Sequence, residues 1–322
     1  MTAMRIASCP WDAPLEEFCA AAAAAGYAGI QYNVGPEAAA ADRLRAALDR
    51  HGLRLAATTA GGMFQDPATR EAEIEAAVAE ARRARALGAT ALEMMCGARP
   101  VGGPTPAQLR AYAAGLNEVG RRCADLGVRV GVHNHCILFL ETAAEIDLLY
   151  EHADPRYVGT GFDTGHLALA GVDAAECFRR YAARTAYVHL KDLYEVSRPA
   201  GLSDRILDFA ALVALAEAAD IYTWLVIRTV EGQRLVLGGG ALGHAFLRGH
   251  RGRIQGARCR DIAEYQFAEV GCGGLVDFAG VLAALQQANF DGWLAVELDV
   301  CYRTRLESAR MSRQYLRERL GL

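Results

Sequence analysis

The sequence predicts an α/β fold in which a single (β/α)8 TIM-type barrel carries a long insertion after its seventh strand. Short apolar runs typical of strands alternate with longer amphipathic segments along all 322 residues. No Gly-x-Gly-x-x-Gly motif follows the first strand, whereas a dinucleotide-binding sheet would need one. The chain is 52% hydrophobic, so residues 1–322 can bury one barrel core as a single domain.

Eight strand candidates and the helices between them follow the βα rhythm. The strands are predicted at residues 5–9, 29–34, 53–59, 91–96, 128–135, 158–164, 186–192 and 293–299. Helical spacing of apolar residues marks segments 14–25, 38–50, 70–87 and 106–126. Gly52, Gly88 and Gly127 follow helical segments, where a left-handed glycine ends a helix. Thr142 and Glu145 have the spacing of a capping box, which predicts a helix start after the fifth strand.

Residues 196–265 interrupt this rhythm because they are far longer than a βα loop needs to be. An amphipathic stretch at 204–219 predicts a helix, and a hairpin with its turn at 231–232 follows. The Arg-rich run at 248–260 is interpreted as a solvated basic loop. Long insertions at a barrel mouth form lids, substrate walls or subunit contacts, and we expect one of these roles here.

Composition argues against several classes of partner. A net charge of -4 and a pI near 6.1 give no electrostatic footprint for nucleic acid or an anionic membrane. The apolar stretches are too short to span a bilayer, and residues 1–11 show no signal-peptide pattern. Nine cysteines without CxxC spacing indicate reduced thiols. We therefore expect a cytoplasmic protein with neither a nucleic-acid nor a membrane partner.

Four potential metal ligands lie in or just after predicted strands. They are Glu141, Asp163, His189 and Glu297. Side chains at the carboxyl ends of barrel strands converge on one mouth. Three carboxylates and one imidazole suit Mn²⁺, Mg²⁺ or Co²⁺ better than a thiolate zinc centre. Glu297 sits in the apolar run WLAVEL, where an unpaired carboxylate is costly to bury, whereas Glu141 follows a turn.

Three further polar residues are candidates for chemistry. His133 and His135 share one face of a strand, so either can be an acid/base or bind substrate hydroxyls. The alternative for the second of them is a hydrogen-bonded core histidine. Lys191 follows His189 by two residues and could polarise a substrate oxyanion. Its alternative is a salt bridge that orients a carboxylate ligand.

The motifs of the second half resemble a known family. HNH…ET…EID, DP-x-x-VG-x-x-x-DTGHL, A-x-VHLKD, FAEVGCGGLVDF and FDGWLAVELD are similar to the sugar phosphate isomerase/epimerase superfamily, which has a xylose-isomerase-like barrel. The likeness is greatest to inosose (2-keto-myo-inositol) dehydratase-like members. Two departures stand out. The chain reads HLKDLYEVSR where ketose 3-epimerases carry an Arg after the metal His, and its insertion exceeds the usual loop.

The resemblance implies one divalent metal ion, Mn²⁺ first and Co²⁺, Mg²⁺ or Zn²⁺ as alternatives, held by the four ligands named above. It also implies that His166 binds substrate, a role that His135 and Lys191 could share. The implied protein is a metal-dependent isomerase, epimerase or dehydratase-like lyase that acts on a keto-sugar or keto-cyclitol by removing an α-proton. Glu141, Glu297, His133 and His135 are candidates for the base, with Lys191 as an electrostatic partner.

Other readings stay open at this point. A related branch, the catalytic subunit of C-glycoside deglycosidases, eliminates an aglycone from a 3-keto sugar and works with a second subunit. A DNA-repair endonuclease on the same barrel would need more histidine ligands and a basic face. A non-catalytic binding subunit is the third alternative. We expect a homo-oligomer, or a hetero-oligomer with a small partner subunit.

Overall fold

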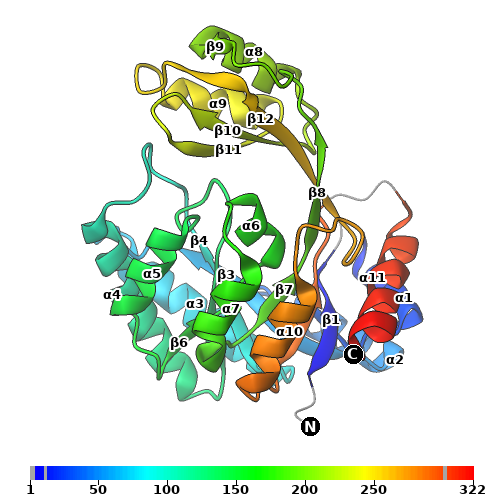
Figure 1. Cartoon of the computed structure of the whole chain (residues 1–322). Coiled ribbons are helices and arrows are strands. Elements are labelled where there is room, and N and C mark those ends of the chain that lie inside the picture. The colour runs from blue at the N-terminus through cyan, green and yellow to red at the C-terminus, as the bar shows by residue number, and fades with distance from the viewer. Residues whose placement is uncertain (1–3, 11–12, 300–302) are drawn as a thin grey trace.

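Eight parallel strands form the barrel in a computed structural model that describes residues 4–10, 13–299 and 303–322. Their order is β6-β5-β4-β3-β2-β1-β13-β7, and bridges from Thr160 to Thr185 and from Asp163 to His189 connect the two edge strands. The predicted barrel is therefore confirmed (Figure 1). The strands are β1 (Arg5–Ser8), β2 (Gly29–Gln31), β3 (Arg54–Gly62), β4 (Ala91–Cys96), β5 (Arg129–His133), β6 (Val158–Thr160), β7 (Val188–Leu190) and β13 (Trp293–Val296).

Helices connect these strands and cover the outside of the barrel (Figure 1). They are α1 (Leu15–Ala25), α2 (Ala38–His51), α3 (Arg70–Ala86), α4 (Pro106–Ala124), α5 (Ala143–His152), α6 (Thr164–Leu169), α7 (Ala174–Tyr181), the 3-10 turn η1 (Ala182–Arg184), α10 (Phe278–Gln287) and α11 (Arg305–Leu320). The four helices predicted before residue 127 all form, with ends shifted by two residues or fewer. Several strands end earlier than predicted, because the chain turns into the mouth of the barrel.

Local sequence signals set the helix ends. Thr142 and Glu145 form the predicted capping box at the start of α5, and the same device opens α4 and α11. Gly52, Gly88 and Gly127 have φ angles of 65°, 93° and 70°, as predicted for left-handed glycines after a helix. These signals fix where each helix stops and hence where the next strand enters the barrel.

The core has two layers. Leu, Ile, Val and Phe side chains fill the space between the strands and the surrounding helices. Inside the barrel, Tyr187 and Trp293 fill the amino-terminal end among small side chains such as Ala57, Ala91 and Ala295. This packed floor leaves the opposite end of the barrel for polar side chains.

Between β7 and β13 the chain forms a second, antiparallel sheet, which we call the inserted subdomain (residues 192–268). Its strand order is β11-β10-β12-β8, and β9 pairs with β12 as well. Its elements are β8 (Asp192–Ser197), β9 (Ile206–Asp208), α8 (Phe209–Ala218), β10 (Trp224–Thr229), β11 (Arg234–Gly238), α9 (Ala241–Gly249) and β12 (Gly256–Ala268). It lies above one end of the barrel and is joined to it through β8 and β12 (Figure 1).

Sequence predictions within this segment had mixed outcomes. The hairpin is confirmed, since β10 and β11 pair in antiparallel fashion across the predicted turn. The helix predicted from 204 was wrong at its start, because 206–208 pairs with β12 and the helix begins at Phe209. The basic-loop interpretation was wrong from Gly256 onward. There Arg258 and Arg260 are exposed and alternate with buried Ala257 and Cys259, which is the pattern of a strand.

The structure also bears on the membrane and cysteine predictions. No helix in the described ranges is long and apolar enough to cross a membrane. The cysteines in those ranges are free thiols, and all but Cys272 are buried. Cys301 lies outside the described residues.

Asp192 ties the inserted subdomain to the barrel. This buried residue lies where β7 passes into β8, and it is the register partner of Ala268 at the end of β12. Its Oδ2 accepts backbone N–H groups from Gly271, Gly273 and Gly274 at 2.9–3.1 Å, while Oδ1 accepts the Leu193 N–H. One carboxylate thus fixes the outgoing and returning strands of the insertion.

Replacing Asp192 with Ala should lower the free energy of unfolding by about 3 kcal/mol, because one buried and three part-buried N–H donors lose their acceptor. Urea unfolding followed by circular dichroism measures this loss. Asp204→Ala is the control, since its partner Arg260 forms an exposed ion pair that contributes about 0.5 kcal/mol. Equal losses in both variants would contradict the assigned role of Asp192.

Candidate functional site

The carboxyl ends of the barrel strands open into a cleft of about 560 Å³. Pro10, Tyr32 and Met95 are the less polar residues of its lining. Its remaining lining is polar or charged and comes from strands on both sides of the barrel: Gln31, Asn33, Thr59, Glu93, His133, His135, His189, Glu297 and Asp299. The cleft therefore has a mostly polar lining, and the buried residues Glu93, His133 and His189 form its floor.

Glu93 on β4 lies at the centre of the floor. Its Oε1 is 2.9 Å from His133 Nδ1 and 2.9 Å from His189 Nε2. Its Oε2 accepts hydrogen bonds from Gln31 Nε2 at 2.6 Å and Thr59 Oγ1 at 2.9 Å. Burial alone would raise the pKa of the Glu93 carboxyl, but the two imidazoles outweigh burial and hold that pKa well below its usual range. Glu93 is therefore an anion at neutral pH.

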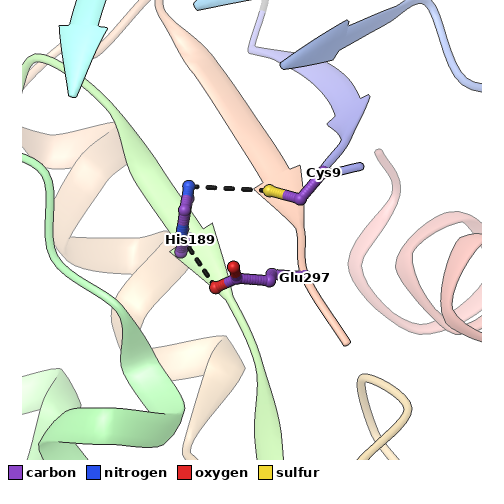
Figure 2. A group of neighbouring side chains, drawn as sticks. All are labelled: Cys9, His189 and Glu297. Atoms are coloured by element: carbon purple, nitrogen blue, oxygen red, sulfur yellow. Dashed lines mark hydrogen bonds and ion pairs between the residues drawn. The ribbon is translucent and has the colours of Figure 1, made fainter. Parts of the chain in front are cut away.

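His189 is held at both ring nitrogens (Figure 2). Its Nδ1 lies 2.9 Å from Glu297 Oε2, and its Nε2 lies 2.8 Å from Gln31 Oε1 and 3.5 Å from Cys9 Sγ. Burial opposes protonation of His189, but the surrounding negative groups raise the pKa of the imidazole well above its usual value. Burial raises the pKa of the Cys9 thiol to about 12, so Cys9 stays neutral.

Asp163 is fully buried and caps α6. Its Oδ1 accepts the His166 N–H at 2.8 Å, and its own N–H is donated to Asn134 Oδ1 at 2.9 Å. Its Oδ2 makes no hydrogen bond within the described ranges, although Lys191 Nζ lies 3.3 Å away and His189 Nδ1 3.9 Å away. Burial raises the pKa of this carboxyl. Oδ2 is thus a buried acceptor that faces positively charged groups.

Lys191 is a buried cation among three carboxylates. Its Nζ lies 2.9 Å from Glu297 Oε2, 2.9 Å from Asp299 Oδ2 and 3.3 Å from Asp163 Oδ2. Burial would lower the pKa of Lys191, but these carboxylates raise it well above its usual value. The salt-bridge alternative for Lys191 matches these contacts, because its ammonium is committed to protein carboxylates.

His135 and His166 stack with their ring centroids 3.6 Å apart. Burial lowers the pKa of His135 to about 3 and that of His166 well below its usual value, so both rings are neutral at neutral pH. His135 Nδ1 lies 2.5 Å from the Cys136 carbonyl oxygen. Nδ1 therefore carries the hydrogen, which leaves a lone pair on Nε2.

The structure brings Asp163, His189 and Glu297 together but leaves Glu141 apart from them. Glu141 Oε2 accepts the Ile137 N–H at 2.7 Å and lies 3.7 Å from Arg99 Nε. Glu141 belongs to none of the close groups of metal-binding side chains in the described part of the chain. The reason is the turn after β5: the carboxylate folds back on its own loop, where Ile137 has a φ of 63°. These contacts brace the loop after β5 and place the Glu141 carboxylate away from the other three predicted ligands.

His133 lies where a fourth ligand was expected. It is grouped closely with Glu93 and His189 on one side and with Asp163 and His166 on the other. The sequence analysis missed Glu93 altogether. Its signal was available, because a glutamate inside the apolar strand ALEMMC needs a buried partner just as Glu297 does.

The donor set fits a divalent cation. Glu93 Oε1, His133 Nδ1 and Asp163 Oδ2 are all buried, and none has an aligned hydrogen bond in the described part of the chain. Asp163 Oδ2 and Glu297 Oε2 already converge on one cation, the Lys191 ammonium. Oxygen and imidazole donors of this kind suit Mn²⁺, Co²⁺ or Zn²⁺. The residues present can therefore hold a metal ion.

Comparison with known proteins assigns this barrel to a family. The family model of the xylose isomerase-like TIM barrel matches residues 19–319. The chain therefore belongs to the xylose isomerase-like TIM barrel family. The Geobacillus kaustophilus inosose dehydratase is 34% identical over 163 residues, which are 47% of this chain and 53% of that protein. The chain thus spans about half the length of the curated relatives it matches.

Solved structures with the same fold are more distant in sequence. An L-ribulose 3-epimerase matches with a TM-score of 0.63 and 17% identity, covering 97% of this chain and 93% of its own. A 3-keto-D-glucoside 4-epimerase from E. coli matches with a TM-score of 0.63 and 13% identity, covering 98% and 99%. At these identities the likeness establishes the barrel fold alone.

Glu93→Gln should destabilise the metal-free protein by about 3–5 kcal/mol at pH 7, because two buried imidazoles lose their shared anion. The folded-state pKa of Glu93 is depressed, so its stabilising effect is present above the ordinary glutamate pKa of about 4.3 and is lost as the pH falls through the folded-state pKa. The difference between wild type and variant should therefore shrink on acidification.

Urea unfolding from pH 7 down to pH 3 in EDTA measures this difference, with the exposed Glu151→Gln as the control. A difference that grows toward acid pH would show that Glu93 is not the ionised partner of the two imidazoles.

Proposed function

We propose that the protein is an enzyme that uses one divalent metal ion to remove a proton next to the carbonyl group of a keto-sugar or keto-cyclitol. The observation that supports this most strongly is that His133, His189 and Glu297 line the barrel-mouth cleft. Asp163 lies buried directly behind them, grouped with His133 and with its Oδ2 3.9 Å from His189 Nδ1. Mouths of this kind are where such barrels carry out chemistry. The curated relatives are named inosose dehydratase, and this name supports a keto-cyclitol as the substrate.

Asp163, His189 and Glu297 would hold the ion, with His133 in the role expected for Glu141. Mn²⁺ is our first choice, with Co²⁺, Mg²⁺ and Zn²⁺ as alternatives. When bound, the ion would supply positive charge that polarises the substrate carbonyl and stabilises an enediolate. Lys191 neutralises the excess negative charge of the ligand carboxylates and fixes their orientation.

Two residues that line the cleft can accept the substrate proton. Glu297 is ionised, since Lys191 and His189 outweigh burial and hold its pKa well below the usual range. His135 presents the lone pair of Nε2 once its Nδ1–H is donated to the Cys136 carbonyl. Glu141 is not part of the cleft lining. We therefore assign the base role to Glu297 or His135 and retain His133 as a ligand.

The fate of the intermediate decides the reaction. Return of the proton to another carbon or face gives isomerisation or epimerisation, and loss of a β-hydroxyl gives dehydration. The names of the relatives include a dehydratase and epimerases, whose reactions can share this first proton abstraction. We therefore propose the proton abstraction that these reactions share.

A second candidate is elimination of an aglycone from a 3-keto-glycoside, with a small partner subunit. The observation that favours it is the cleft, whose volume of about 560 Å³ and less polar lining residues Tyr32, Met95 and Pro10 leave space and apolar surface for a group beyond one sugar ring. A homo-oligomeric state and a cytoplasmic location are proposals that rest on the sequence alone.

Metal analysis by inductively coupled plasma mass spectrometry should find about one divalent ion per chain. Asp163→Asn and Glu297→Gln should both lower bound metal to background, because each removes a charged donor. Glu141→Gln is the matched control and should keep its metal. Loss of metal in Glu141→Gln, together with full occupancy in His133→Leu, would return the ligand role to Glu141.

Turnover in D₂O tests the chemistry. Keto-inositols, free ketoses and 3-keto-glucosides are incubated with the enzyme, and the recovered substrate and product are examined by NMR. Proton abstraction predicts deuterium at the carbon next to the carbonyl or a primary isotope effect at that position. Complete retention of the original hydrogen in an isomerised product would indicate a hydride shift and contradict the proposal.

A further inference from the structure

The sheet of the inserted subdomain has two apolar faces with different partners. On β10, Leu225 and Ile227 pack in a core that α8 and α9 complete. Their neighbour Val226 points to the other face, as strand alternation requires. On β11, Leu237 joins the helix-facing core, whereas Val236 lies on the same face as Val226. The second face therefore needs a partner of its own.

The barrel supplies that partner. Val226, Val236 and Phe267 of the subdomain form one buried cluster with Cys136, which follows β5, and Leu169, the last residue of α6. The subdomain is consequently packed on the loops that follow β5 and β6. These are the loops that carry His135 and Asp163.

Two aromatic rings of this face lie against the stacked histidines. The Trp224 ring centroid is 5.9 Å from that of His166 and 6.3 Å from that of His135. The Phe267 centroid is 5.0 Å from that of His166. Lys191 Nζ lies 4.6 Å from the centroid of the same Phe267 ring. Trp224 and Phe267 thus form the wall behind the charged residues of the site.

Arg234 on β11 binds the end of α6. Its Nη2 donates to the Leu169 carbonyl at 2.7 Å, and its Nε donates to the Ala170 carbonyl at 3.1 Å. The opposite end of this helix is capped by Asp163, and His166 lies in its first turn. A six-residue helix is too short to be stable alone, so contacts with the rest of the protein must fix it. A cation at its C-terminus also complements the helix dipole.

We infer that the inserted subdomain is a fixed support behind the active site that positions α6, with Arg234, Trp224 and Phe267 as the positioning residues. Arg234 holds the C-terminal end of the helix, and the two rings hold His166 from the side. The placement of Asp163 Oδ2 and His166 therefore depends on a segment that lies outside the barrel. This inference rests on the proposed function only in treating Asp163 and His166 as site residues.

Arg234→Ala tests the inference, and Arg228→Ala is the matched control. Arg228 is the cross-strand neighbour of Arg234 and is exposed. Hydrogen–deuterium exchange reports the stability of residues 164–170, and calorimetric titration with Mn²⁺ reports the affinity of the site. We expect Arg234→Ala to speed exchange in this segment and to weaken Mn²⁺ binding about tenfold, with a lower kcat and an unchanged KM. Arg234→Lys should restore part of the protection from exchange and part of the Mn²⁺ affinity.

Arg228→Ala should leave exchange and affinity at the wild-type values. Should Arg234→Ala prove poorly folded, Trp224→Phe against Trp224→Ala gives the same comparison, with the aromatic variant expected to be close to wild type. Exchange in residues 164–170 that is equal in Arg234→Ala and Arg228→Ala overturns the inference. Failure of the wild-type protein to bind Mn²⁺ overturns the proposed metal site instead, while the exchange measurement still decides the role of the subdomain.

Discussion

The structure depends on charge compensation inside the mouth of the barrel. Asp163, Lys191, Glu93 and His189 are all buried, with exposed fractions of 1% or less. Any one of them without its partners would cost several kcal/mol of desolvation. The carboxylates and cations must therefore lie in contact with one another. The register of the parallel strands makes this possible, because it brings the carboxyl ends of the strands to one place. A site for a divalent cation likewise requires carboxylate and imidazole donors that converge on one point.

This demand explains several local choices in the sequence. The stem of Lys191 passes so close to Gly165 that an added Cβ would lie 2.9–3.1 Å from three of its carbons. A Cβ added at Gly161 would lie 2.9–3.4 Å from three backbone atoms of Gly131. The backbone of the DTGH segment is thus pressed against its neighbouring strands, which lets Asp163 face Lys191 and His189. A larger side chain at Gly165 would push the cation and its carboxylates apart.

The sequence was sufficient to predict the barrel and to predict several of the side chains that gather at its mouth. Hydrophobic runs, glycine caps and the Thr142 capping box located the elements, because these signals act over a few residues. Asp163, His189 and Glu297 could be predicted to lie close together because each lies at the end of an apolar strand, and the structure places them side by side. Glu141 lies apart from them because the turn after β5 decides where its carboxylate points, and no local pattern encodes that direction.

The role of the inserted subdomain could not be predicted from the sequence. Its hairpin was predictable from the alternation of apolar and polar residues. β12 was not recognised as a strand from the sequence because of its arginines, and it became evident only from its pairing with β10 and β8. That Trp224 and Phe267 would face His166 is a product of how two sheets dock, and this depends on contacts between residues far apart in the chain. Sequence proximity to β7 placed the insertion near the site without giving its role.

The most direct test of the account is a crystal structure of the Mn²⁺-loaded protein with diffraction data on both sides of the manganese absorption edge. The account predicts one anomalous peak per chain in contact with Asp163, His189, Glu297 and His133, with Glu141 still bonded to the Ile137 N–H. A peak in contact with Glu141, or manganese bound only outside the barrel mouth, would contradict it.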